Sequence, residues 1–218
     1  MIIRRFGSFV SVAIAVAAAG PVRAQDVPQA PWKIADIGLG DTPAAVAATL
    51  ARAGYRRDWQ LEGRSWEAEV AAKAAWLRGI HAPPETHVTQ NEVYRKDQER
   101  LFVDYLATPA GPLLWRIEYR ILARLVDEGR FRAAVGQRYG EPRRRWTNEL
   151  AYCSPAGTSC NLSISPDARQ LPTLTVRFND ITDRSIELSH GERAERNYAQ
   201  AVIQEVDRRY PKKQQPSF

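Results

Sequence analysis

The stretch from Leu113 to Ile121 alternates between two sets of side chains along its whole length. One set is apolar and consists of Leu113, Trp115, Ile117, Tyr119 and Ile121. The other set is mostly charged and consists of Leu114, Arg116, Glu118 and Arg120. Because successive side chains of a β-strand point to opposite faces, this period of two predicts a half-buried strand. The chain is therefore expected to build a sheet with one face in a core and the other in water.

Further strands are expected on both sides of this one. They are predicted at about 88–95, 100–108, 145–153, 160–165, 174–178 and 186–188. Residues 96–98 and the run Pro109-Ala110-Gly111-Pro112 are rich in turn formers, and each is expected to join two neighbouring strands. Strands joined by such short turns pair in the antiparallel sense.

Four helices are predicted from capping residues and from apolar residues at helical spacing. They are expected at about 42–54, 65–79, 127–139 and 189–210. Pro43 suits the first position of a helix, and Ser65 is a good N-cap. Ser189 and Glu192 have the spacing of a capping box, which predicts that the last helix starts at Ser189.

The order of these elements predicts an α+β fold. Two helix-then-antiparallel-sheet modules are expected in tandem, over residues 36–122 and 123–210, with a C-terminal helix closing the second. A polar tail is expected at 211–218. The sequence leaves open whether the two modules arose by duplication.

The first 24 residues have the layout of a cleavable signal peptide. Arg4 and Arg5 precede an apolar run that is too short to span a bilayer as a helix, and cleavage is expected between Ala24 and Gln25. An uncleaved N-terminal anchor is the alternative. A flexible lead-in is expected at 25–35, with no transmembrane segment after it. The chain has 26 Arg and 5 Lys, which is typical of a GC-rich bacterial genome, so the expected location is periplasmic or secreted.

The charge of the chain argues against a nucleic-acid partner. The formal net charge is +6, but loss of residues 1–24 leaves 28 basic against 25 acidic residues, a balance of +3. Nucleic-acid binders usually carry a clustered basic excess, whereas the signs are mixed here. The run Arg143-Arg144-Arg145 is either a phosphate-binding patch or the solvated start of a strand.

The two cysteines, Cys153 and Cys160, are separated by the turn-forming run Ser-Pro-Ala-Gly-Thr-Ser. Export would place them in an oxidising compartment, so we expect a disulfide across the base of a β-hairpin. A redox pair is the alternative, although the spacing is wider than in a Cys-x-x-Cys motif.

The segment Ile37-Gly38-Leu39-Gly40-Asp41-Thr42-Pro43, followed by Val46, Leu50 and Gly54-Tyr55, resembles a pattern of uncharacterised exported bacterial proteins. That pattern runs Leu-Gly-Met-[Ser/Thr], then Val, Leu and Gly-Tyr at helical spacing. It is also similar to segments of small outer-membrane assembly lipoproteins and of the β-lactamase inhibitor protein. The resemblance implies helix–helix–antiparallel-sheet units, singly or in tandem. Asp41 replaces the usual Met, and the lipid-bearing Cys of the lipoproteins is missing, which argues against a role in outer-membrane assembly. No residue matches the binding loops of the inhibitor protein, so no binding residue is carried over.

The sequence contains no catalytic or cofactor motif that predicts an enzyme. His81 and His87 flank a Pro-rich connector that contains Glu85, which is either a surface loop or a metal site of unusual spacing. We predict no catalytic residue, cofactor or metal, and we expect His190 to have a structural role.

The polar side of the predicted sheet is the candidate binding surface. Arg116 and Arg120 share one side of their strand with Glu118, and Arg177 is expected on the same side in the second module. These residues form either a charged platform for an anionic ligand or protein partner, or an ordinary solvated sheet face. The leading hypothesis is a non-enzymatic exported module that binds a protein or envelope component. The alternative is a periplasmic hydrolase with an unrecognised acid or His site.

Overall fold

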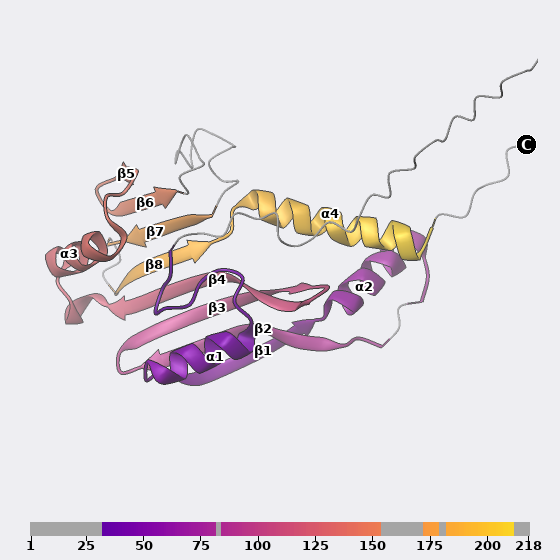
Figure 1. The fold of residues 1–218 in the computed structure, drawn as a ribbon, viewed down its shortest axis with the longest axis horizontal. Helices are drawn as coiled ribbons and strands as arrows, with labels where there is room; N and C mark the ends of the chain where they lie inside the picture. Colours follow the sequence, from indigo (N-terminus) through magenta and orange to yellow (C-terminus); the bar gives the residue numbers. More distant parts are fainter. Residues whose placement is uncertain (1–31, 82–83, 154–171, 179–181, 212–218) are drawn as a thin grey trace, which may run out of the picture.

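Eight strands of the described chain form one antiparallel sheet in the order β1-β2-β3-β4-β8-β7-β6-β5 (Figure 1). The computed structural model describes residues 32–81, 84–153, 172–178 and 182–211. The strands are β1 (Arg56–Arg64), β2 (His87–Lys96), β3 (Glu99–Thr108), β4 (Gly111–Leu122), β5 (Arg144–Arg145), β6 (Glu149–Cys153), β7 (Thr173–Arg177) and β8 (Asp183–Ser189). The helices are α1 (Pro43–Arg52), α2 (Trp66–Arg78), the 3-10 turn η2 (Ala123–Leu125), α3 (Glu128–Tyr139) and α4 (Glu192–Arg209).

The sheet consists of two meanders that meet at their last strands. Strands β1 to β4 follow one another from one edge, and β5 to β8 follow one another from the other edge. The two meanders are joined where β4 pairs with β8, from Arg116 opposite Ser189 to Leu122 opposite Asp183. The predicted α+β fold, with helix-then-strand units and a C-terminal helix, is confirmed.

Helices α1 and α3 pack on the same face of the sheet and bury its main core. Thr42 caps α1 by accepting a hydrogen bond from the Ala45 amide at 3.3 Å, and Asp127 caps α3 in the same way. Each helix buries two apolar residues four positions apart in this core. The residues of this core include Val46, Leu50, Phe131, Val135, Leu101, Val103, Ile117, Leu174, Val176 and Leu188.

Helices α2 and α4 lie side by side and bury a second, smaller cluster (Figure 1). Trp66 of α2 meets the ring of Tyr198 edge-on, with the ring centroids 5.7 Å apart. At the other end of α2, Arg78 donates to the backbone carbonyl of Tyr210 at 3.2 Å and forms an ion pair with Asp207. The C-terminal helix is therefore fixed to the first half of the chain. None of the helices in the described ranges is both long and apolar enough to cross a membrane.

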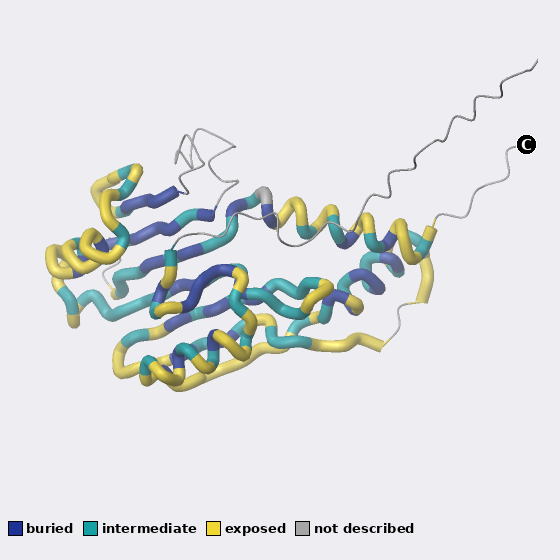
Figure 2. The backbone as a smooth tube through the Cα atoms, in the orientation of Figure 1, coloured by how far each residue is buried: buried dark blue, intermediate teal, exposed yellow. Residues whose placement is uncertain are grey.

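Strand β1 was not predicted from the sequence. It forms one edge of the sheet, and nearly all of it is exposed (Figure 2), so it lacks the apolar alternation that reveals a half-buried strand. Its pairing with β2 is interrupted by two irregularities, between Arg57 and Trp59 and between Leu61 and Glu62. Bulges and charged side chains are common protections of an exposed edge against pairing with other chains.

A bulge in β4 makes the predicted alternation wrong at its first residues. Asp104 of β3 pairs with Arg116, but Tyr105 pairs with Leu114, so an extra residue is inserted in β4. Leu114, which was expected on the polar side, is fully buried in the core. From Arg116 onward the predicted faces hold, because Ile117, Tyr119 and Ile121 pack with the core.

The predicted start of the last helix is also wrong. Ser189 ends β8 and pairs with both Arg116 and Thr173, so its backbone belongs to the sheet. The N-cap is Gly191, which has no side chain that could accept a capping hydrogen bond. The strand predicted at 145–153 is broken as well, because Trp146 donates to the carbonyl of Glu149 at 2.8 Å in a tight turn between β5 and β6.

The packed chain begins before residue 36. Ile34 and Ile37 pair across a turn, and both are buried in the core, although Ile34 lies in the stretch 25–35 that was expected to be a lead-in. The predicted signal peptide, its cleavage site at Ala24 and Gln25, the strand at 160–165 and most of the tail lie outside the described residues.

We predict that Leu188→Ala lowers the free energy of unfolding by about 2–5 kcal/mol, because a fully buried leucine leaves a cavity. Leu188 has no exposed surface and pairs with Ile117 in one meander and Leu174 in the other. Both meanders should therefore lose stability together in a single transition on urea unfolding. Ile203→Ala, at a position of α4 that is 40% exposed, is the control and should change stability far less. Two separate transitions, with only one shifted, would contradict the continuous sheet.

Candidate binding face

The face of the sheet opposite α1 and α3 carries three rows of side chains, which the strand register defines. We call it the open face, because neither α1 nor α3 covers it. Its residues Ala151, Cys153 and Thr175 on β6 and β7 are nevertheless buried. The arginine row runs through Arg56, Arg95, Arg100, Arg120, Ser185, Arg177 and Glu149. The central row runs through Trp59, Val93, Phe102, Glu118, Glu187, Thr175 and Ala151. The third row runs through Leu61, Asn91, Asp104, Arg116, Ser189, Thr173 and Cys153.

Arg116 is the centre of an ion-pair network on this face. Its guanidinium lies 2.8 Å from Glu187, 3.0 Å from Glu118 and 3.3 Å from Asp104. Glu187 is shared with Arg177 at 2.9 Å, and Glu118 is shared with Arg120 at 2.7 Å. The network therefore connects β3, β4, β8 and β7, and it crosses the junction of the two meanders.

The three arginines that the sequence singled out, Arg116, Arg120 and Arg177, all belong to this network. They lie on one face, and each holds at least one carboxylate while 37–43% of its side chain stays exposed. The residue that joins Arg116 to Arg177 is Glu187. Burial alone would raise the pKa of the Glu187 carboxyl group, but the hydrogen bonds from both arginines outweigh burial and lower that pKa below its ordinary value.

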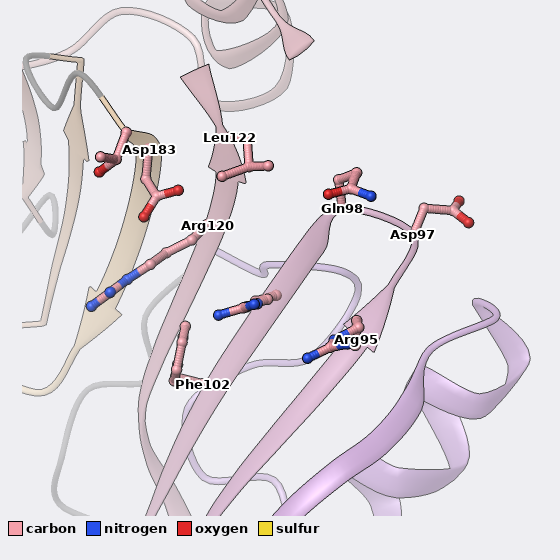
Figure 3. Close-up of a pocket in the computed structure, with 9 residues that line it drawn as sticks. Arg95, Asp97, Gln98, Phe102, Arg120, Leu122 and Asp183 are labelled. Atoms are coloured by element: carbon pink, nitrogen blue, oxygen red, sulfur yellow. The ribbon is translucent and has the colours of Figure 1, made fainter. Parts of the chain in front are cut away.

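A pocket of about 260 Å³ lies at one end of the arginine row. Arg95, Arg100 and Arg120 line it from three neighbouring strands, together with Phe102. Figure 3 shows Arg95, Arg120 and Phe102 on these strands. The guanidinium of Arg120 lies 4.7 Å from the centre of the Phe102 ring, within the range of a cation–π contact. Asp97 and Gln98 line the pocket from the turn between β2 and β3, and Asp183 lines it from β8.

The three arginines of the pocket differ in their partners. Arg95 lies 2.9 Å from Asp58, and Arg120 lies 2.7 Å from Glu118. Arg100 lies between them, is exposed, and forms no ion pair with any residue that the structure describes. Arg95 and Arg100 were not among the predicted site residues, because only the pairing register of β2, β3 and β4 reveals that they lie beside Arg120.

On the opposite face, Glu92 is a buried carboxylate with 2% of its surface exposed. It accepts hydrogen bonds from the hydroxyls of Tyr94 at 2.9 Å and Tyr105 at 2.8 Å, and from Arg57 at 2.8 Å. Burial, followed by the bonds to Glu92, raises the pKa of both tyrosines well above the ordinary value, so both are neutral donors. Because Arg57 lies on the edge strand, this cluster attaches β1 to the core, and it is not part of the pocket.

The histidines do not form a site in the described part of the chain. His87 lies 3.7 Å from Glu85 on the surface, and His81 is exposed. No group of three or more potential metal ligands is found among the described residues. His190 packs against Trp115 with the ring planes tilted by 44° and the centroids 4.9 Å apart. Burial lowers the pKa of His190 to about 4, so it is neutral at pH 7.

Of the two cysteines in the predicted disulfide, the structure describes one. Cys153 ends β6 and is buried, whereas Cys160 lies outside the described residues, so the bond between them stays a prediction.

Comparison with models of protein families, with curated proteins and with solved structures finds no match. The resemblance to exported helix-and-sheet proteins therefore stays an expectation from the sequence. The function has to be inferred from the chemistry of the open face itself.

We predict that Glu187→Gln lowers the free energy of unfolding by about 1–3 kcal/mol at pH 7, because two arginines lose a shared charged acceptor. The pKa of Glu187 is lower in the folded chain than its ordinary value. Its ionised form therefore stabilises the fold fully above about pH 5, and this contribution is lost as the pH falls below about 4. Urea unfolding of both proteins at pH 7 and pH 3 should show the difference shrinking at the lower pH.

The matched control for this prediction is Glu141→Gln. Glu141 pairs with Arg145 at the surface, and 86% of its side chain is exposed, so a change within about 0.5 kcal/mol is expected. An equal loss for both variants, or the same loss at pH 3 as at pH 7 for Glu187→Gln, would show that the network does not stabilise the fold as described.

Proposed function

We propose that this protein is an exported, non-enzymatic binding module and that the open face of its sheet receives a protein partner in the cell envelope. One observation carries the proposal: both α1 and α3 pack on the opposite face, and the side chains of the open face are already held in place by the ion pairs around Arg116. A surface whose side chains are fixed before binding loses less conformational entropy when a partner docks.

The chemistry of the open face favours recognition over catalysis. Its central groups are arginines and carboxylates that neutralise one another, and the guanidinium of arginine stays protonated at any physiological pH. Near the β1 edge, Trp59 is 50% exposed and Leu61 is 45% exposed, and both lie in rows that continue into the charged network. Aromatic side chains and arginines are the residues enriched at the energetic centres of protein interfaces.

The hydrolase alternative gains no specific support. It requires a pocket that contains His81, His87 or a pair of carboxylates near a reactive group. The pocket described above has three arginines in its lining instead, together with Asp97 and Asp183 on opposite sides. In the residues that the structure covers, the histidines lie elsewhere.

Export and the disulfide are parts of this proposal that one measurement tests. We expect intact mass spectrometry of the chain recovered from the envelope to show a protein that begins at Gln25 and is lighter than the reduced chain by two hydrogen atoms. Treatment with a reductant should restore the two hydrogens, and Cys160→Ser should remove the difference. A chain that retains residues 1–24, or that carries two free thiols when isolated under alkylating conditions, would contradict export with an oxidised hairpin.

The binding role is tested by photo-crosslinking inside the cell. We expect benzoylphenylalanine at Val93 or Ser185, both on the open face, to form a crosslinked product with the same partner from either position. The control is benzoylphenylalanine at Ala48, which is exposed on α1 and distant from that face. Mass spectrometry identifies the product. No product from the open face, or the same product in equal yield from Ala48, would refute the proposal.

A further inference from the structure

The pocket of the arginine row places three like charges side by side. Arg95 pairs directly with Arg100 in the register of β2 and β3, and Arg100 pairs directly with Arg120 in the register of β3 and β4. Like charges opposite one another on neighbouring strands are destabilising, because their side chains are only about 5 Å apart at the Cβ atoms. Such an arrangement has to be compensated by carboxylates, either in the chain itself or in a ligand.

Carboxylates of the chain pair with the two outer arginines of the pocket but not with the middle one, among the residues that the structure describes. Asp58 lies 2.9 Å from Arg95, and Glu118 lies 2.7 Å from Arg120. Arg100 forms no ion pair with a residue in the described ranges, and it lines the pocket between the two paired arginines. Among the three arginines that line the pocket, the one without a carboxylate partner is therefore Arg100. Arg56, which pairs with Arg95 in the register of β1 and β2, does not line the pocket.

The charges that line the pocket indicate how much negative charge it accepts. Three arginines and two aspartates line it, and Asp58 and Glu118 already pair with Arg95 and Arg120. The charge left for a ligand is that of Arg100, which a single carboxylate matches, whereas a phosphate dianion would place two negative charges near Asp97 and Asp183. The planar fork of a guanidinium also matches the two oxygens of a carboxylate.

The surroundings of the pocket favour a peptide as the source of this carboxylate. Phe102 and Leu122 give the pocket apolar surface that can contact side-chain methylene groups. Farther along the row, Arg177 already pairs with Glu149 and Glu187, so the pocket is the part of the row where a carboxylate of a peptide finds an arginine that is not engaged.

We propose that the pocket of Arg95, Arg100 and Arg120 binds a side-chain carboxylate of an acidic segment in the protein partner, with Arg100 as the main contact. This inference rests on the proposed function, and it adds the chemistry of the partner and the place where that partner is recognised.

The test is the binding of a fluorescent hexaglutamate peptide to the chain purified from the envelope, followed by fluorescence polarisation. We expect saturable binding that weakens at higher salt, and no binding of the matched hexaglutamine peptide. Arg100→Glu should weaken binding at least tenfold, and Arg100→Gln should weaken it by a smaller factor. The control is Arg130→Glu, which makes the same change of charge on α3 at a side chain that is 86% exposed, and it should change the affinity less than threefold.

Two further probes separate the possible sources of the anion. Inorganic phosphate and vesicles of phosphatidylglycerol with phosphatidylcholine are tested at the same ionic strength, each with the parent chain and with Arg100→Glu. Binding of phosphate or vesicles that depends on Arg100, without binding of hexaglutamate, would overturn the peptide assignment. Equal loss of hexaglutamate binding in Arg100→Glu and Arg130→Glu would overturn the pocket, because only net charge would then matter.

Failure of this inference is distinguishable from failure of the proposed function. If crosslinks from Val93 and Ser185 form and Arg100→Glu leaves them unchanged, the open face still binds a partner but the carboxylate pocket is wrong. If those crosslinks are absent too, both proposals fail. A melting temperature of Arg100→Glu within a few degrees of the parent shows that a loss of binding is not a loss of fold.

Discussion

The pairing of β4 with β8 is the constraint on which the rest of the structure depends. It joins two four-stranded meanders into one sheet, from Arg116 opposite Ser189 to Leu122 opposite Asp183. On one face this pairing brings Ile117 beside Leu188, so that a single core extends under both α1 and α3. On the other face it places Glu118 opposite Glu187, which would be unfavourable without the arginines between and beside them. The charged network is thus a direct consequence of the strand pairing.

The arginines at this junction cannot be replaced by lysines without changing the geometry. Arg116 has donors directed at three carboxylates from three different strands, which requires the several N–H groups of a planar guanidinium. A lysine ammonium is a compact charge on a flexible stem and would satisfy fewer of these acceptors in fixed positions. Because the acceptors are partly buried, each one left without a donor would destabilise the sheet.

Local patterns predicted most of the elements, whereas the pairing of distant strands had to come from the structure. The period of two in β4 correctly placed Ile117 and Arg116 on opposite faces, and the predicted cap Ser65 is the N-cap of α2 in the structure. The bulge opposite Asp104 depends on β3 as well as β4, so the burial of Leu114 could not be read from either strand alone.

The elements that were not predicted from the sequence also depend on pairing between strands. Strand β1 has almost no buried side chain, since it belongs to the sheet through backbone pairing with β2 and through the bond from Arg57 to Glu92. Ser189 has the sequence context of a cap, but its backbone is already used by two neighbouring strands. The candidate site shows the same dependence. The alternation of side chains along single strands predicted the positions of Arg116, Arg120 and Arg177. Only the pairing register places Arg95 and Arg100 beside Arg120.

The distribution of ion pairs decides where on the open face a carboxylate of a partner can bind at least cost. At Arg116 it would have to displace Glu187, Glu118 or Asp104, and the displaced carboxylate would lose a charge-assisted hydrogen bond in a partly buried place. At Arg120 it would compete with Glu118, which has only 8% of its side chain exposed. At Arg100 no pair within the described residues has to break, because the cation is exposed and faces the pocket. The ion pairs around Arg116 therefore hold the other arginines in place, and Arg100 is the pocket arginine that remains available for recognition.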